Sequence, residues 1–269
     1  MAQMKMRAKI TLGFVVMIVL IVTVGVVAII FLNQASKDFT QYREWARDSN
    51  LMSNLQENML MVRMNVKDFL IRGDEKEKEE FDQYFAEVTN LKEEALEEIQ
   101  AADRAPLVQE IAGSLDTYAS HFDSVVDLQA QRDEQVTGVM DVVGPRIEQD
   151  LTRILSSAER DGDMTAAFYA SLSLRNLMLA RLYAFKFLDS NAKEHEERTL
   201  SELEEMDANL EILDREVQNS ERRALLAEIE EYYAEYGTAF RQVVDIIYKR
   251  NDHVDSYLDV IGPDIASKA

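Results

Sequence analysis

The feature that most constrains this chain is an internal duplication. The segment MDVVGP at residues 140–145 recurs as LDVIGP at residues 258–263, a shift of 118 residues. The same shift places NMLMVRMNVKDFL, which begins at Asn58, on NLMLARLYAFKFL, which begins at Asn176. Within these segments Arg63 falls on Arg181, and farther along the chain the shift pairs Tyr118 with Tyr236, Phe122 with Phe240, and Arg132 with Arg250. A register kept without a gap over this length indicates two copies of one structural unit.

The composition predicts that this unit is helical. The 269 residues include only 9 Gly and 3 Pro, while Ala, Leu, Glu, Lys, Arg, Gln and Met are abundant. The abundant residues form helices readily, and few residues remain to make turns. The formal charge of −21 argues against nucleic-acid binding, which depends on Lys and Arg. Because the sequence has no Cys, disulfides and thiolate metal sites are excluded.

The amino-terminal end predicts a membrane anchor. The stretch from Ile10 to Leu32 has no charged side chain and would span about 34 Å as a helix, enough to cross a ~30 Å hydrocarbon core. A secretory signal would have a shorter apolar region and a cleavage site of small residues, and neither is evident. Lys5, Arg7 and Lys9 precede the span, so the positive-inside rule places this end in the cytoplasm. The predicted segments are a cytoplasmic terminus at 1–9, a transmembrane helix at 10–32 and a periplasmic domain at 33–269, in an inner (cell) membrane.

Local signals place the helix ends. Gly73 ends one helix, and Asp74 with Glu77 forms a capping box that begins the next. Apolar residues at helical spacing predict the core-facing stripe of the first helix: Leu51, Leu55, Met59, Val62, Val66 and Phe69. With weaker breaks farther along, six helices are expected, at about residues 36–72, 75–101, 105–160, 164–190, 193–218 and 221–269.

The helix lengths predict the topology. The third and sixth helices would be about 84 and 73 Å long, whereas the second, fourth and fifth would be about 40 Å. Because short connections make consecutive helices antiparallel, we expect an all-α fold of two stacked four-helix bundles that share the two long helices. Each long helix contains one Gly-Pro pair, whose proline is expected to kink it. The expected modules are a membrane-proximal one at about 36–130 plus 250–269 and a distal one at about 131–249.

The single anchor, the 118-residue duplication, the long shared helices and the twin D-V-[VI]-G-P motifs together resemble the helical bimodular sensor domain of bacterial methyl-accepting chemotaxis receptors. The resemblance covers about residues 33–269. It implies a homodimeric chemoreceptor sensor that binds small organic acids, such as dicarboxylates and acetate, in one or both modules. A second membrane span and a cytoplasmic signalling region are then expected to follow Ala269.

Arginine is the residue suited to a carboxylate ligand, because its planar guanidinium makes two parallel hydrogen bonds to the two oxygens. In the distal module Arg181, Arg146 and Arg241 are expected at about 73, 76 and 69 Å from the membrane. Three cations at one level repel one another unless an anion joins them. These three residues therefore form the main predicted ligand site.

The proximal module has a different charge pattern at the same positions. The repeat counterparts of the three arginines are Arg63, Asp264 and Asp123, which are able to neutralise one another. We therefore expect the distal module to be the better anion site and the proximal one to be self-satisfied or suited to an amine-bearing ligand. Another interpretation stays open for Arg63 and Arg181, in which each lies at a bundle edge with its guanidinium in water.

Further ligand-binding candidates have weaker support. Arg132 and Arg250 fall near the junction of the modules, at about 55 Å, where they either reach a site or clamp the modules together. The remaining candidates are Arg175, Asn176, Asn58, Tyr183, Tyr236 and Tyr118.

An enzyme is not expected. His121, His195 and His253 lack metal-ligand spacing, and the sequence has no Gly-rich phosphate loop or evident nucleophile-base arrangement. The Glu-x-x-His signature of di-iron bundles is absent as well. Neither a metal nor another cofactor is predicted. Two alternatives stay open: the same sensor joined to a histidine kinase or another output, and a membrane-anchored structural coiled-coil protein.

Overall fold

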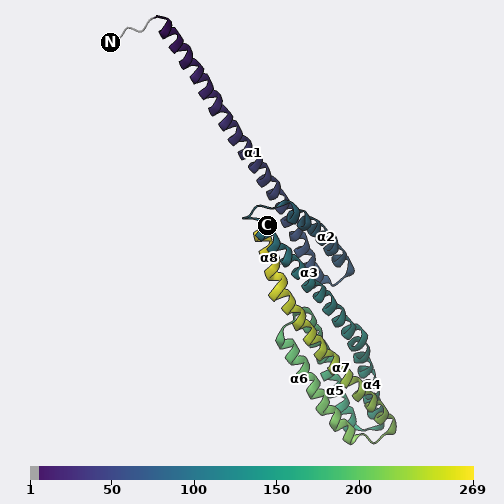
Figure 1. Ribbon diagram of the computed structural model, residues 1–269. Coiled ribbons are helices and arrows are strands. Elements are labelled where there is room, and N and C mark those ends of the chain that lie inside the picture. The colour runs from purple at the N-terminus through teal and green to yellow at the C-terminus, as the bar shows by residue number, and fades with distance from the viewer. Residues whose placement is uncertain (1–5) are drawn as a thin grey trace. The chain divides into compact units, whose positions relative to one another are not determined.

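The computed structural model describes residues 6–269, so the predicted basic residue Lys5 lies outside the described chain. Within this range the chain is helical apart from short turns, and it contains no strand, which confirms the predicted all-α class. The predicted anchor and first helix form one continuous helix, and the helix ends predicted after it agree to within three residues. The elements in order are α1 (Met6–Arg72), α2 (Glu75–Glu98), α3 (Ala105–Asp133), the π-helix η1 (Glu134–Met140), α4 (Asp141–Asp161), α5 (Met164–Ser190), α6 (Lys193–Glu216), α7 (Ser220–His253), the π-helix η2 (Val254–Leu258) and α8 (Asp259–Lys268) (Figure 1).

The first part of α1 is the single segment in the described range that is long and apolar enough to cross a membrane. Residues 6–45 are all exposed, so this stretch has no protein partner for its Ile, Val, Leu and Phe side chains. Each buried CH₂ group gains about 0.8 kcal/mol over an exposed one, which favours a lipid environment for such a stretch. The helix therefore suggests a single-pass membrane protein.

The chain divides into two compact units. Unit 1 comprises Met1–Gly113 with Ile265–Ala269, and unit 2 comprises Ser114–Asp264. Helices α3 and α8 each supply residues to both units. The module boundaries predicted from helix heights stay a prediction.

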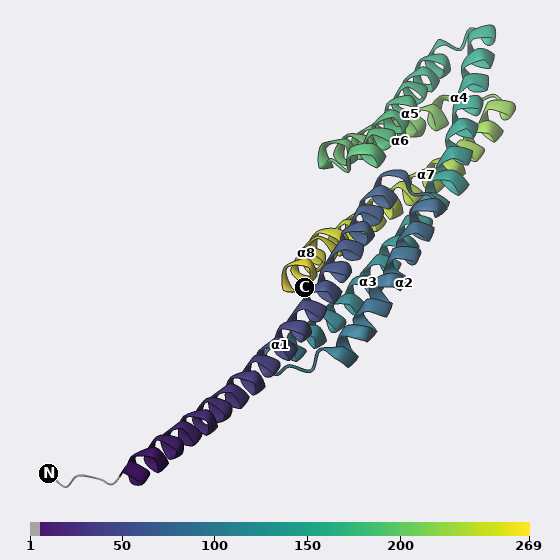
Figure 2. The ribbon, with the colours of Figure 1, turned by 90° about the horizontal axis from the view of Figure 1, so that it is seen from above.

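The core of unit 1 forms where the second part of α1 packs on α2 (Figure 2). All six residues of the predicted stripe from Leu51 to Phe69 are buried, which confirms that prediction. They face a second apolar stripe on α2, which includes Phe81 and Val88. The turn between the helices has the predicted helix stop and N-cap, since Gly73 has a φ of 69° and the Asp74 carboxylate accepts a hydrogen bond from the Glu77 amide at 3.4 Å. The Glu77 carboxylate, predicted to complete a capping box, instead accepts from Arg72 Nη1 at 2.5 Å.

The core of unit 2 is formed by α4 to α7. Helix α5 packs against α6 and α4, and α4 packs against α7. Phe187 of α5 and Phe240 of α7 meet edge to face, with ring centroids 5.9 Å apart, and both are fully buried. The connection from α4 to α5 passes through Gly162, whose φ is 73°, and the Asp163 carboxylate then caps the Ala166 amide at 3.1 Å.

The two Gly-Pro motifs have a structural feature that the sequence did not predict. In both copies a π-helical segment precedes the motif: η1 ends at Met140, directly before DVVGP, and η2 ends at Leu258, directly before DVIGP. A proline crowds the carbonyl group four residues earlier, which here belongs to Asp141 or Asp259, the first residue after each π-helix. The duplication has thus kept a change of helical pitch together with each proline.

Candidate functional site

Arg181, the central predicted ligand residue, lies where three helices of unit 2 meet. It extends from α5 over Gly144 of α4, so that its Nε lies 3.1 Å from the point that a Cβ on Gly144 would occupy. The Cε2 atom of Tyr236, from α7, lies 3.4 Å from the same point. Arg181 is half-buried and makes no hydrogen bond or ion pair with any other described residue. Its guanidinium is therefore free to bind an anion.

Gly144 is the glycine of the DVVGP motif, and its role is now evident. Gly144 is buried, and any side chain there would meet the Nε and Cδ atoms of Arg181 at 3.1 and 3.4 Å. The missing Cβ thus lets the arginine side chain lie directly on the α4 backbone. Sequence reasoning missed this contact, because it treated the glycine only as a helix breaker.

Two tyrosines contribute polar groups beside Arg181. Tyr236 is buried, and burial raises the pKa of its phenol, although the charge of Arg181 opposes the shift. The Tyr236 hydroxyl is therefore neutral, and it has no hydrogen-bond partner among the residues that the structure describes. Tyr233 donates to the Leu203 carbonyl at 3.0 Å, and burial raises its pKa to about 12. Of the two, Tyr236 has the hydroxyl that is available to a ligand.

The other two arginines of the predicted trio, Arg146 of α4 and Arg241 of α7, contact the same stretch of α7. Arg146 donates from Nη1 to the Tyr232 hydroxyl at 3.2 Å, and its guanidinium lies over that ring. Arg241 donates from Nη1 to the Gly237 carbonyl at 3.2 Å. Both are exposed, and neither has an acidic partner among the described residues. The structure thus brings Arg146, Arg181 and Arg241 to residues 232–241 of α7.

Arg250 and Arg132, the predicted junction residues, have different surroundings. Arg250 is buried and donates hydrogen bonds to three side-chain amides, those of Gln129, Asn191 and Asn251. Burial, and then the charge of Arg132, lower its pKa. Arg132 is only partly buried and pairs with the neighbouring carboxylate of Asp133. Arg250 is therefore placed to hold unit 2 together.

Arg175 and Asn176 are adjacent in sequence but differ in environment. Arg175 is exposed on α5. Asn176 is buried and donates from Nδ2 to Glu202 at 2.6 Å and to Glu205 at 3.0 Å, while its Oδ1 accepts from Asn209 at 3.1 Å. These bonds join α5 to α6 and leave Asn176 occupied within the protein.

The remaining predicted residues are spread over both units. Tyr183 lies under two cations of unit 2, with Lys186 Nζ 4.9 Å and Arg198 Cζ 5.6 Å from its ring centroid. In unit 1, Arg63 is half-buried and without a hydrogen bond or ion pair in the described chain, and Asn58 donates to the Asn54 carbonyl at 2.9 Å. Tyr118 is buried. The predicted neutralisation of Arg63 by Asp264 and Asp123 stays a prediction.

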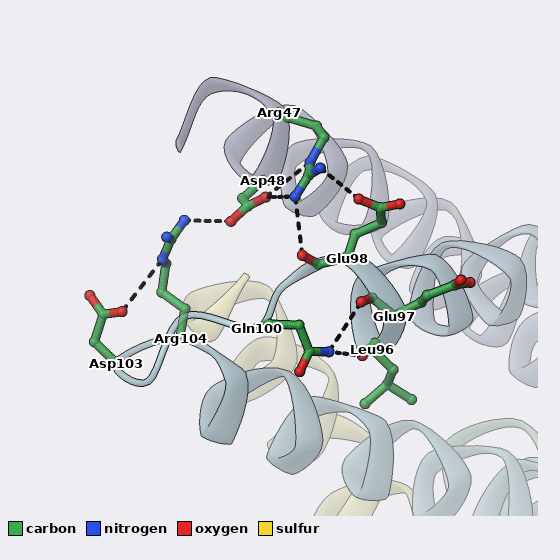
Figure 3. Close-up of polar contacts among 8 residues, drawn as sticks. All are labelled: Arg47, Asp48, Leu96, Glu97, Glu98, Gln100, Asp103 and Arg104. Atoms are coloured by element: carbon green, nitrogen blue, oxygen red, sulfur yellow. Dashed lines mark hydrogen bonds and ion pairs between the residues drawn. The ribbon is translucent and has the colours of Figure 1, made fainter. Parts of the chain in front are cut away.

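Unit 1 contains a charged cluster that sequence reasoning missed (Figure 3). Arg104, in the turn directly before α3, donates to Asp48 Oδ2 at 2.5 Å, and Arg47 contacts Asp48 Oδ1 at 3.2 Å and Glu98 Oε2 at 2.6 Å. Asp48 is buried, whereas Arg47 is half exposed. The cluster joins the part of α1 that follows the apolar stretch to the end of α2 and the start of α3.

A cavity of about 310 Å³ lies beside this cluster. Apolar side chains that include Trp45, Met52 and Ile111 line one part of it, and Asp48 and Arg104 line another. The Arg104 Nε is buried without a hydrogen-bond partner, and it lies 3.7 Å from Asp103 Oδ1 (Figure 3). Such a cavity suits a small molecule that has an apolar body and one oxygen acceptor.

The repeat counterpart of Arg104 is Arg222, and it too lines a cavity, of about 480 Å³, within unit 2. Arg222 is buried and bonds Asp161 at 2.8 Å and Asp163 at 3.1 Å, and its Nε also lacks a partner. The two arginines are separated by the repeat offset of 118 residues, so a comparison of the two copies could have identified them. No group of three or more His, Cys, Asp or Glu residues that could hold a metal ion occurs within residues 6–269.

A comparison with known protein families finds a match for the part of the chain that contains the first copy. A family described as the four helix bundle sensory module for signal transduction matches residues 3–136. The chain has no significant match among curated proteins. The matched family indicates a sensory rather than a catalytic domain. Residues 3–136 thus match a signal-transduction sensory module, which together with the apolar part of α1 fits the sensor region of a chemoreceptor.

Proposed function

We propose that this chain is the periplasmic sensor region of a transmembrane chemoreceptor and that unit 2 binds small organic acids. Arg181 carries the proposal, because it is a half-buried guanidinium with no acidic partner among the described residues. A guanidinium of this kind binds a carboxylate through two charge-assisted hydrogen bonds. Arg146 and Arg241 add positive charge nearby, and Tyr236 adds a free hydroxyl.

The placement of the sensor outside the cytoplasm and its pairing with a second copy belong to the same proposal. The basic residues Arg7 and Lys9 before the apolar stretch favour a cytoplasmic amino terminus. The exposed apolar residues Met178, Leu182 and Phe185 of α5 are spaced four and three apart, as in a coiled-coil seam, which supports a homodimer. The helical bimodular subtype and a cytoplasmic output beyond this chain are further parts of the proposal.

Replacing Arg181 by alanine is expected to weaken acid binding by about 100-fold, because two charge-assisted hydrogen bonds are lost. The measurement is isothermal titration calorimetry of the detergent-solubilised full chain with acetate, succinate and citrate. Arg175→Ala serves as the control, since Arg175 is exposed on the same helix, six residues earlier. Arg63→Ala tests the equivalent position in unit 1.

Equal acid affinity in the wild type, Arg181→Ala and Arg63→Ala proteins would refute the assignment of these residues. A structural coiled-coil protein makes a different prediction, because it would bind none of the acids. In that case no acid would raise the melting temperature, whereas a sensor is stabilised by RT ln(1 + [L]/Kd).

Signal transfer through the last helices gives a second expectation. The run α7–η2–α8 contains Tyr236 in the middle of α7 and ends at Lys268, so a ligand held at Tyr236 favours one packing of the run from there onward. The sequence has no native cysteine to interfere with crosslinking. Single cysteines placed along α7 and α8 of the full chain are expected to form intersubunit disulfides at rates that change when a bound acid is added. Rates that stay the same at every position would argue against this route.

A further inference from the structure

Two histidines of unit 2 meet across helices α3 and α7. The Nδ1 atoms of His121 and His253 lie 2.8 Å apart, at hydrogen-bonding distance. The His121 ring also stacks on Tyr257, with centroids 3.7 Å apart and planes inclined by 15°. The chain has 3 histidines, so two of them are used in this single contact.

The contact requires a particular protonation state. In an N–H···N bond between imidazoles one ring donates and the other accepts, so at least one ring must be neutral. When both rings are protonated, each presents an N–H to the other and both carry positive charge. Acid therefore turns the attraction into a repulsion, in the pH range where histidine titrates.

The histidine pair lies at the boundary between α7 and the π-helix η2. His253 is the residue before the π-helix η2, and Tyr257 is part of η2. The hydrogen bond and the ring stack thus tie η2 to α3. A π-helical segment differs from its α-helical alternative in its hydrogen-bond pattern, so the contact holds a segment that has two available conformations.

The duplication shows that the fold does not need these histidines. The first-copy counterparts of His253 and Tyr257 are Gln135 and Val139, both in η1, and the residue aligned with His121 is Ala239. The helix η1 forms without a histidine pair or an aromatic stack at these positions. The pair is therefore an addition to η2 and not a requirement of the π-helix.

We propose that His121 and His253 form a proton-sensitive clamp on η2, which is closed at neutral pH and opens in acid. The device is separate from the proposed acid site, because it uses none of the residues around Arg181. It gives the sensor region a response to external pH.

The charged and titratable groups that face the pair within unit 2 shift the pKa of His121. Burial, followed by the charge of His253, lowers the pKa of His121, and Asp252 opposes this shift. Tyr257 contributes a neutral ring. A histidine whose folded-state pKa is lowered stabilises the closed form above its unfolded pKa of about 6.5. This contribution is lost as the pH falls through the lower, folded-state value.

The test compares hydrogen exchange in η2 and η1 of the same full chain, in detergent, between pH 7.5 and pH 5.0. Rates are corrected for the chemical exchange rate at each pH, and EDTA is present throughout. Two variants, His253→Gln and His121→Ala, install the residues that stand at the equivalent positions of the first copy. In both variants η1 remains as an internal control.

The wild-type protein is expected to lose about fivefold of the protection of the η2 amides on acidification, the equivalent of one net hydrogen bond, while η1 stays unchanged. Both variants are expected to show η2 protection that does not depend on pH. Equal loss in η1 and η2, or an acid response that persists in both variants, would overturn the proposal. In a separate arm Zn²⁺ is added in excess of the EDTA at pH 5.0, and recovery of the η2 protection there would also overturn the proposal, in favour of a metal site.

Discussion

Replacing Arg250 by alanine is expected to lower the free energy of unfolding by about 3 kcal/mol, because three side-chain amide oxygens, one of them buried on Gln129, lose a donor. Arg250 Nη1 donates to Gln129 at 3.1 Å, and Nη2 donates to Asn191 at 2.8 Å. Its Nε and Nη2 also donate to Asn251, at 3.2 and 2.9 Å. The buried Arg250 side chain thus joins α3, the end of α5 and α7. The alanine side chain of the variant is too short to make any of these hydrogen bonds.

The effect depends on the conformation at the end of α5. Asn191 is the only non-glycine residue of the described chain with a positive φ, 54°, and it ends α5 as its C-cap. Its Oδ1 accepts from both Arg250 and Asn251, which holds the residue in this left-handed conformation. Loss of Arg250 is therefore expected to loosen the connection from α5 to α6.

Arg132 provides a matched control, because it is the first-copy counterpart of Arg250. It is more exposed and pairs with a neighbour in sequence, Asp133. Arg132→Ala is expected to change the free energy of unfolding by less than about 0.5 kcal/mol, as for other exposed pairs. Urea unfolding of the detergent-solubilised chain, followed by far-ultraviolet circular dichroism, measures both variants. Similar losses in the two would show that Arg250 has no special role.

Replacing Arg222 by alanine is expected to cost about 2 kcal/mol, less than a fully buried ion pair because its two acidic partners are partly hydrated. The Arg222 side chain is 5% exposed, whereas those of Asp161 and Asp163 are 53% and 29% exposed. Asp161 ends α4, and Asp163 caps α5. The arginine therefore fixes the α4–α5 turn to the start of α7.

The neighbouring Arg223 is the control for this prediction. Its side chain is 51% exposed and lies 3.8 Å from Asp214. Arg223→Ala is expected to have an effect below about 0.5 kcal/mol in the same urea experiment. An Arg222→Ala protein as stable as Arg223→Ala would mean that the two ion pairs at the turn contribute nothing to the fold.

The helices could be predicted because their signals are local. Helix formers, the helix stop at Gly73 with the N-cap at Asp74, and the apolar stripe from Leu51 to Phe69 act over a few residues, and the structure has all of them. Arg146, Arg181 and Arg241 each lie close to residues 232–241 of α7, but their assembly into one site stays a prediction. Their role in binding stays a prediction.

The partners of individual side chains could not be predicted in this way. Asn176 and Arg250 were both candidates for a ligand, yet each has its polar atoms bonded to protein groups. Which residue a side chain contacts depends on the rotation of each helix about its own axis. Adding helix rises gives only the position of a residue along the axis, so it does not predict that rotation. The π-helices, which shift this rotation, were not predicted either.

The sequence by itself determined that the chain is helical, that it begins with an apolar segment long enough to cross a membrane, and that it contains two copies of one unit, because these properties follow from composition, periodicity and repetition along the chain. Only the tertiary structure decided what the DVVGP glycine does and that His121 meets His253. Both contacts join residues of different helices within a few ångströms, a distance that depends on the packing of those helices and not on their separation in sequence.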